Sequence, residues 1–153
     1  MALSEGVCRL GRWSVRVVWE GDFVHEVRFC DLPPGGEVPA PIAAYCRGEQ
    51  VDLSLLRSSA LERPGKSASI YREVCAVPYG MTTTYGTIAR LVGTSARAVG
   101  QVMRRNPTPL VVPCHRVIGA DGSILGFSPS VAIKEHLLAM EHGRSVKRSD
   151  AEL

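Results

Sequence analysis

Residues 82–107, TTTYGTIARLVGTSARAVGQVMRRNP, constrain the fold more than any other stretch of the chain. Their apolar spacing predicts one short helix over residues 85–92 and a second over residues 96–105. Residues 93–95, Gly-Thr-Ser, form the turn between them, and Asn106-Pro107 ends the second helix. Two short helices joined by a turn that contains glycine are typical of a helix-turn-helix.

The part of the chain before this segment has the pattern of a small sheet with one helix. Residues 12–32 alternate polar and apolar side chains around Gly21-Asp22, which predicts a β-hairpin. A loop rich in Pro and Gly leads to a short helix that ends at Gly48. Residues 57–69, RSSALERPGKSAS, are interpreted as a linker, with a domain boundary near Ser67.

The remaining segments favour helices around a short buried stretch. Residues 69–77 predict a helix that stops before Pro78, and residues 110–112 a short buried strand or extended segment. VAIKEHLLAMEHG predicts an amphipathic helix that ends at Gly143. The fold class is therefore α/β in the broad sense, an α+β protein. We expect an N-terminal sheet-plus-helix domain over residues 1–67 and a mostly helical C-terminal domain with the helix-turn-helix over residues 68–143. Residues 144–153 are expected to be a disordered polar tail.

The composition of the chain bears on its cellular location and on the growth temperature of its source. No window of about 20 apolar residues exists, and the N-terminus lacks the apolar core of a signal peptide, so we expect a cytoplasmic protein without membrane contact. The shortage of Asn and Gln is typical of thermophiles, although genomic base composition gives the same bias.

The five cysteines have irregular spacing, which indicates neither a disulfide framework nor a paired zinc motif. We expect no metal and no cofactor. Two alternatives stay open: an N-terminal metal site made of Cys8, His25 and Cys30, and a disulfide among Cys8, Cys30 and Cys46.

Charge is distributed unevenly along the chain. Residues 74–120 contain no Asp or Glu but five arginines, which are Arg90, Arg97, Arg104, Arg105 and Arg116. Such a stretch is either a solvated face or a surface that binds a polyanion. The second predicted helix also begins with small residues, Ala96, Ala98 and Gly100, which allow close approach to another helix or to nucleic acid.

The stretch VVPCHRVIG places Cys114 between an apolar run and two potentially cationic side chains. A thiol in this context is an inert core residue, a metal ligand, half of a disulfide or a nucleophile. Pro113 lacks an N–H group, so Cys114 is expected at the edge of a secondary-structure element on a constrained backbone.

PCHRVIG, preceded by SARAVGQVMRRNP and followed by KEHLLAMEHG, resembles the O6-alkylguanine-DNA alkyltransferase family, in order from about Ile70 to Gly143. The resemblance implies DNA repair by a single transfer of an alkyl group from guanine O6 to Cys114. It also implies that His115 is the base, acting through a water, and that Glu141 orients His115. Asn106 would tie the end of the second helix to the cysteine loop.

The resemblance also implies how double-stranded DNA carrying O6-alkylguanine is bound. The helix with Ala96, Ala98, Gly100 and Met103 would lie in the minor groove, and Arg97 would enter the base stack in place of the flipped guanine. Tyr85 would contact the phosphate and the leaving base. The pocket would be completed by Ser128, Phe127 and the carbonyls of Cys114 and Val117. The protein is expected to act as a monomer.

The loop LGFSPS at residues 125–130 departs from the family pattern, which is rich in glycine. Pro129 fixes φ and removes a donor, so we expect a stiffer and narrower pocket. Two other functions are kept as alternatives. One is a non-catalytic protein that binds alkylated DNA, which lacks the cysteine in its known forms. The other is a Cys-His hydrolase or a helix-turn-helix regulator.

Overall fold

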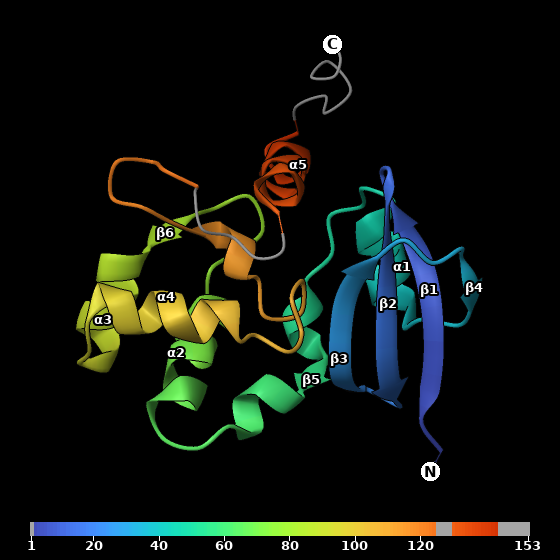
Figure 1. Ribbon diagram of the computed structural model, residues 1–153, viewed down its shortest axis with the longest axis horizontal. Coiled ribbons are helices and arrows are strands. Elements are labelled where there is room, and N and C mark those ends of the chain that lie inside the picture. The colour runs from blue at the N-terminus through green and yellow to red at the C-terminus, as the bar shows by residue number, and fades with distance from the viewer. Residues whose placement is uncertain (1, 125–129, 144–153) are drawn as a thin grey trace.

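The computed structural model describes residues 2–124 and 130–143. A twisted sheet forms one side of the molecule and helices form the other, with helix α1 against the inner face of the sheet (Figure 1). None of the helices in the described ranges has the length and apolar character needed to cross a membrane. The expected α+β class is confirmed.

The sheet has five strands in the order β4-β1-β2-β3-β5. Their bounds are Ser4–Leu10, Trp13–Glu20, Phe23–Cys30, Gly35–Gly36 and Arg57–Ser58 for β1 to β5. The hairpin β2–β3 is confirmed, and its turn holds Gly21 at a φ of 61°. Strand β1 was not predicted, because one of its two buried positions is Gly6, which supplies no apolar side chain. A Cβ on Gly6 would lie 2.2 Å from the Glu37 carbonyl oxygen, so only glycine fits.

The linker interpretation of residues 57–69 is wrong for most of that segment. Strand β5 pairs in parallel with β3, and the 3-10 helix η2, Ser59–Glu62, follows at once. The Ser58 hydroxyl lies 2.6 Å from the Thr108 hydroxyl in the interior, which ties this segment to the C-terminal half. Helix α2, Lys66–Cys75, begins earlier than predicted and runs across the predicted boundary near Ser67. The division into two domains stays a prediction.

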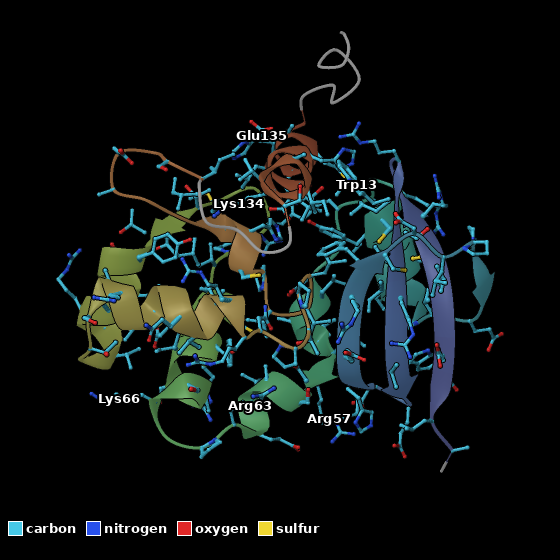
Figure 2. The ribbon with its side chains drawn as sticks, viewed as in Figure 1. Trp13, Arg57, Arg63, Lys66, Lys134 and Glu135 are labelled. Atoms are coloured by element: carbon cyan, nitrogen blue, oxygen red, sulfur yellow. The ribbon has the colours of Figure 1, made fainter. Side chains whose placement is uncertain are left out.

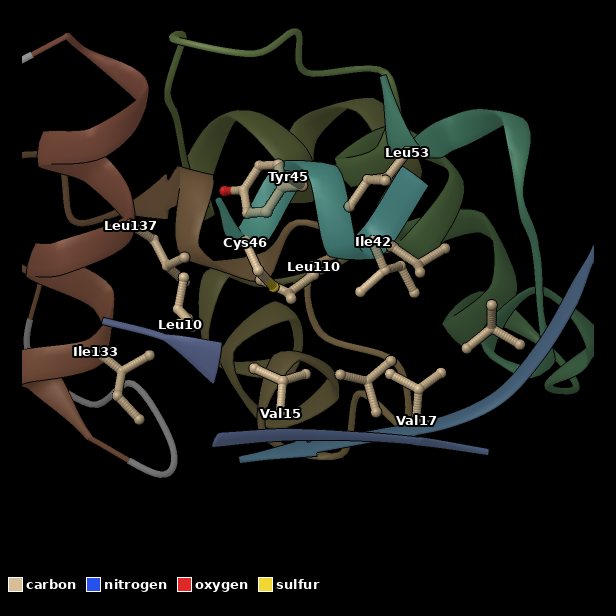
Figure 3. Packing of buried hydrophobic residues seen from close by; sticks show 13 residues of the cluster. Leu10, Val15, Val17, Ile42, Tyr45, Cys46, Leu53, Leu110, Ile133 and Leu137 are labelled. Carbon is tan, nitrogen blue, oxygen red and sulfur yellow. The ribbon is translucent and has the colours of Figure 1, made fainter. Parts of the chain in front are cut away.

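Helix α1, Ala40–Cys46, and the 3-10 helix η1, Leu53–Leu55, cover the inner face of the sheet. Figure 3 shows the side chains of α1 above Val15 and Val17 of β2. This first apolar cluster also includes Leu110 and Leu137 from the C-terminal half. The sheet is therefore packed against both halves of the chain.

The predicted helix pair is confirmed to within one residue as α3, Tyr85–Val92, and α4, Ala96–Arg104. The Thr84 hydroxyl accepts the Thr87 N–H at 3.1 Å and the Ser95 hydroxyl accepts the Ala98 N–H at 3.1 Å, so both helices have side-chain N-caps. Both helices pack with α2 around a second apolar cluster that contains Cys114.

Residues 110–112 are buried as predicted, but the strand prediction is wrong. They belong to a tight turn in which Pro109 and Val112 form an isolated bridge. Leu110 has a φ of 79°, the one positive value for a non-glycine residue in the described part of the chain. This left-handed residue turns the backbone back toward α4 just before the cysteine segment.

Candidate active site

Two short strands fix the position of the cysteine segment. Cys114 begins the 3-10 helix η3, Cys114–Arg116, and strand β7, Val117–Ile118, follows directly. Strand β7 pairs in parallel with β6, Thr83–Thr84, which immediately precedes α3. The pairing brings Tyr85, the first residue of α3, to the cysteine segment. Cys114 itself is only 4% exposed.

Asn106 joins the end of α4 to this segment, as predicted. Its side-chain amide donates to the Val112 carbonyl at 2.9 Å, and its amide oxygen accepts the Thr108 N–H at 3.0 Å. Burial raises the pKa of the Cys114 thiol, while a hydrogen bond from Asn106 acts in the opposite direction. Asn106 thus shapes the turn and also stabilises the thiolate.

His115 and Glu141 form a buried pair. Nε2 of His115 lies 2.6 Å from Oε2 of Glu141, and each side chain is 1% exposed. Glu141 ends helix α5, Val131–Glu141. An ionised carboxylate only accepts hydrogen bonds, so Nε2 carries the proton and Nδ1 presents a lone pair. Burial lowers the pKa of His115, which keeps the ring neutral and able to act as a base.

Glu141 has further donors that the sequence did not reveal. Arg116 donates from Nε to Oε1 at 2.8 Å and from Nη2 to Oε2 at 2.9 Å. The Tyr45 hydroxyl of α1 donates to Oε2, and the Gly80 N–H donates to Oε1 at 3.2 Å. Burial alone would raise the pKa of Glu141, but the hydrogen bonds from His115 and Arg116 outweigh it and lower the pKa far below its usual range. The carboxylate is therefore permanently charged and rigidly held.

Arg116 corrects one part of the charge analysis. It is 8% exposed and bound to Glu141 and to the Val77 carbonyl, so it does not belong to a basic surface. Arg90, Arg97, Arg104 and Arg105 are exposed, on or at the ends of α3 and α4. Four of the five arginines in residues 74–120 are therefore exposed, and these four lie together on the helix pair.

Lys134 is a buried cation that sequence reasoning missed. It is fully buried in α5, and its Nζ donates to the Val117 carbonyl at 2.6 Å (Figure 2). The same Nζ lies 5.8 Å from the centre of the Tyr85 ring. Its charge counteracts part of the rise that burial causes in the pKa of Cys114. A lysine within an apolar helical run was the available signal, because a buried charge needs a partner.

The carbonyl of Val117 was expected to accept from the guanine amine. Because it already accepts from Lys134, only its second lone pair is left for a ligand. Tyr85 is half-buried beside the thiol, and burial raises the pKa of its hydroxyl, with the Cys114 charge acting in the same direction. The hydroxyl thus stays protonated and able to donate.

The outer surface of α4 has the expected small residues. Ala96 and Arg97 are exposed, and Ala98 and Gly100 are partly exposed. A Cβ on Gly100 would meet no atom within 4 Å, so the chain itself does not require glycine there. Met103, one helical turn after Gly100, is 9% exposed and packs in the second apolar cluster.

A pocket of about 340 Å³ between β3 and the end of α4 reaches Cys114. Met103 and Asn106 line it from the helix side, and Arg28 from the sheet. Phe127 and Ser128, two predicted pocket residues, lie outside the described residues. In the described ranges, no three His, Cys, Asp or Glu side chains cluster as a metal site would need, so Cys8, His25 and Cys30 do not form one.

The C-terminal half matches a known family model. Residues 66–143 match the model described as "6-O-methylguanine DNA methyltransferase, DNA binding domain". The methylated-DNA–protein-cysteine methyltransferase of Archaeoglobus fulgidus is 33% identical over 144 residues, which cover 86% of this chain and 94% of that protein. The chain belongs to the methylated-DNA–protein-cysteine methyltransferase family.

Further relatives agree with this family assignment. The methyltransferase of Methanosarcina barkeri is 40% identical over 109 residues, 69% of this chain, and the match spans 66% of its own length. The crystal structure of the Mycobacterium tuberculosis O6-methylguanine methyltransferase aligns with a TM-score of 0.72 and 26% identity, over 94% of this chain and 95% of that one. A complex of the M. tuberculosis protein with DNA aligns with a TM-score of 0.73 at 25% identity, over 91% and 92% of the two chains. The expected family, that of DNA repair methyltransferases, is confirmed.

Proposed function

We propose that this protein repairs alkylated DNA by moving the alkyl group from O6 of guanine to Sγ of Cys114, once per molecule. The observation that carries the proposal is the buried pair of His115 and Glu141 directly after the buried Cys114, within the segment that matches the family. A base held by a permanently charged carboxylate is the arrangement that activates a nucleophile. An inert core thiol would need neither.

The reaction begins with deprotonation of the thiol. Nδ1 of His115 accepts the proton of Cys114 through a water, and Glu141 stabilises the imidazolium that forms. Lys134 and Asn106 stabilise the thiolate. The thiolate attacks the alkyl carbon, and the carbon–O6 bond breaks with its electron pair on the guanine. The Tyr85 hydroxyl donates a proton or a hydrogen bond toward the leaving base, which balances its negative charge. The thioether has no return path, so each molecule acts once.

The exposed face of α3 and α4 is the proposed DNA-binding surface. The pair would act as a helix-turn-helix with α4 in the minor groove, where Ala96, Ala98 and Gly100 allow close approach. Arg97 would fill the space left by the flipped guanine. The exposed arginines of the helix pair support a surface for DNA, and the M. tuberculosis complex supports DNA as the partner. That Ser128 and Phe127 belong to the pocket stays a prediction from the family resemblance. Action as a monomer in the cytoplasm and a thermophilic source stay predictions from the sequence.

The test is the intact mass of the protein after incubation with duplex DNA that carries O6-methylguanine. Wild-type protein should gain one methyl group on Cys114 and no more, with no added cofactor. Cys114→Ala should bind the same DNA and gain nothing. Methyl groups on another cysteine, or turnover beyond one equivalent, would contradict the proposal, and turnover would favour the hydrolase alternative. Binding without any transfer by the wild type would favour a lesion-binding protein.

A further inference from the structure

Two thiols outside the active site lie against each other. Cys8 is in the middle of β1 and is half-buried, and Cys46 is the last residue of α1 and is 7% exposed. Cys8 is on the same face of β1 as the buried Gly6 and Leu10, and it packs on the apolar cluster to which Cys46 belongs. Both are free thiols here. Residues far apart in the sequence thus present two sulfur atoms to one another across the interface of sheet and helix.

We propose that Cys8 and Cys46 are a reversible oxidation site, in which a peroxide converts the two thiols to a disulfide that joins β1 to α1. The Cys8 sulfur attacks one peroxide oxygen, the O–O bond breaks, and Cys8 becomes a sulfenic acid as one water leaves. The Cys46 sulfur then attacks the Cys8 sulfur, the S–O bond breaks, and a second water leaves. Two thiols lose two electrons and two protons, and the peroxide is reduced to two waters.

The surroundings give the two sulfurs different roles. The hydrogen bond from Cys46 lowers the pKa of Cys8, and the Arg47 guanidinium lowers it further against the effect of burial, so the more accessible thiol is also the more acidic one. The same hydrogen bond is the main cause that raises the pKa of Cys46. Once Cys8 is oxidised to the sulfenic acid, that cause no longer raises the pKa of Cys46, whereas burial still does.

Cys46 is adjacent to Tyr45, whose hydroxyl donates to Glu141. Figure 3 shows both side chains on α1, Tyr45 toward the C-terminal half and Cys46 above the sheet. A bond from Cys46 to β1 would therefore anchor the helix that supplies a donor to the active-site carboxylate. This consequence rests on the proposed transfer reaction, whereas the formation of the bond does not.

The test treats reduced full-length protein with equimolar hydrogen peroxide and maps the peptides without reductant. The wild type and the control Cys30→Ser should show a Cys8–Cys46 peptide that is lighter by two hydrogens. Their melting temperatures should rise by several degrees and fall again with dithiothreitol, because the bond restricts the unfolded chain. Cys8→Ser and Cys46→Ala should show neither change.

Three outcomes would overturn the proposal. The map could place oxidation on Cys30 or Cys114 with Cys8 and Cys46 unlinked, it could show no reaction, or the bond could form without raising the melting temperature. Transfer of the methyl group from methylated DNA to the protein is measured in parallel after heating. The oxidised wild type should keep its activity to a higher temperature than the reduced protein. Cys8→Ser treated with peroxide is the control, because this variant cannot form the bond and any loss of its activity reports oxidation of Cys114.

Discussion

Tyr45 in the N-terminal half donates its hydroxyl hydrogen to Glu141 at the end of the last helix. The same hydroxyl lies 3.3 Å from Nε2 of His115. Burial raises the pKa of Tyr45, and the Glu141 charge raises it further, so the phenol stays protonated. The carboxylate that orients the proposed base is thus held from both halves of the chain.

Replacement of Tyr45 by Phe should weaken that support while it keeps the ring. Loss of a hydrogen bond to a buried charge typically costs ~1.5–3 kcal/mol, so the free energy of unfolding should fall by about this amount. Transfer from methylated duplex should slow several-fold in single-turnover assays, because His115 is less firmly oriented. Tyr79→Phe, whose ring packs edge-on against Tyr45, is the matched control. Equal rates for Tyr45→Phe and wild type would show that the hydroxyl serves stability alone.

Lys134→Met should move the pH dependence of transfer. The pKa of Cys114 is already raised by burial, and the Lys134 charge counteracts part of that rise. Without the charge the pKa of Cys114 rises further, so less thiolate exists at neutral pH and the rate profile shifts to higher pH. The check is the single-turnover rate measured from neutral to alkaline pH, with the exposed Lys66→Met as control. Superimposable profiles would mean that Lys134 acts only by supporting the Val117 carbonyl.

Arg97→Ala should separate base flipping from chemistry. Arg97 is exposed, so its removal should leave the melting temperature unchanged. Repair of duplex DNA should weaken markedly, since unstacking a base costs a few kcal/mol that an inserted side chain offsets. Reaction with free O6-alkylguanine needs no flipping and should change little. Arg63→Ala, another exposed arginine, controls for the lost charge. An equal loss on both substrates would assign Arg97 to the structure of the pocket instead.

Methylation of Cys114 should lower the melting temperature of the product. The sulfur is buried in the second apolar cluster, next to the turn that Asn106 holds. Added volume in a packed site typically costs ~1–3 kcal/mol, and the thiolate is lost as an acceptor for Asn106. Paired melts of free, methylated and benzylated protein should therefore show a stepwise fall of a few degrees at each step. A product that melts at or above the temperature of the free protein would mean that the pocket already fits the alkyl group.

The sequence revealed those parts of the fold whose determinants are local. The limits of α3 and α4 followed from apolar spacing, from the Gly-Thr-Ser turn and from Asn106-Pro107, and the hairpin followed from alternation around Gly21. Strand β1 escaped because Gly6 interrupts its apolar pattern, although its partner β2 follows directly. Strand β5 escaped because it has two residues and its partner β3 lies far away in the sequence.

The same division holds for the candidate site. Cys114, His115 and Glu141 stood out through family motifs, and the structure brings His115 and Glu141 into contact. Tyr45 and Lys134 did not stand out, because a tyrosine and a lysine in amphipathic helices are ordinary. Only the tertiary fold shows that their polar atoms point inward. A buried hydrogen-bond network is therefore hard to predict from a single amino-acid sequence.

Gly100 is a glycine that the packing of the protein itself does not require. Alanine favours a helix interior over glycine by about 1 kcal/mol, and the space around Gly100 would accept its methyl group. The unbound protein therefore keeps a weaker helix than its own packing allows. In the proposed function the missing methyl group leaves room for the DNA backbone beside α4, and a screen for thermal stability alone would select against Gly100.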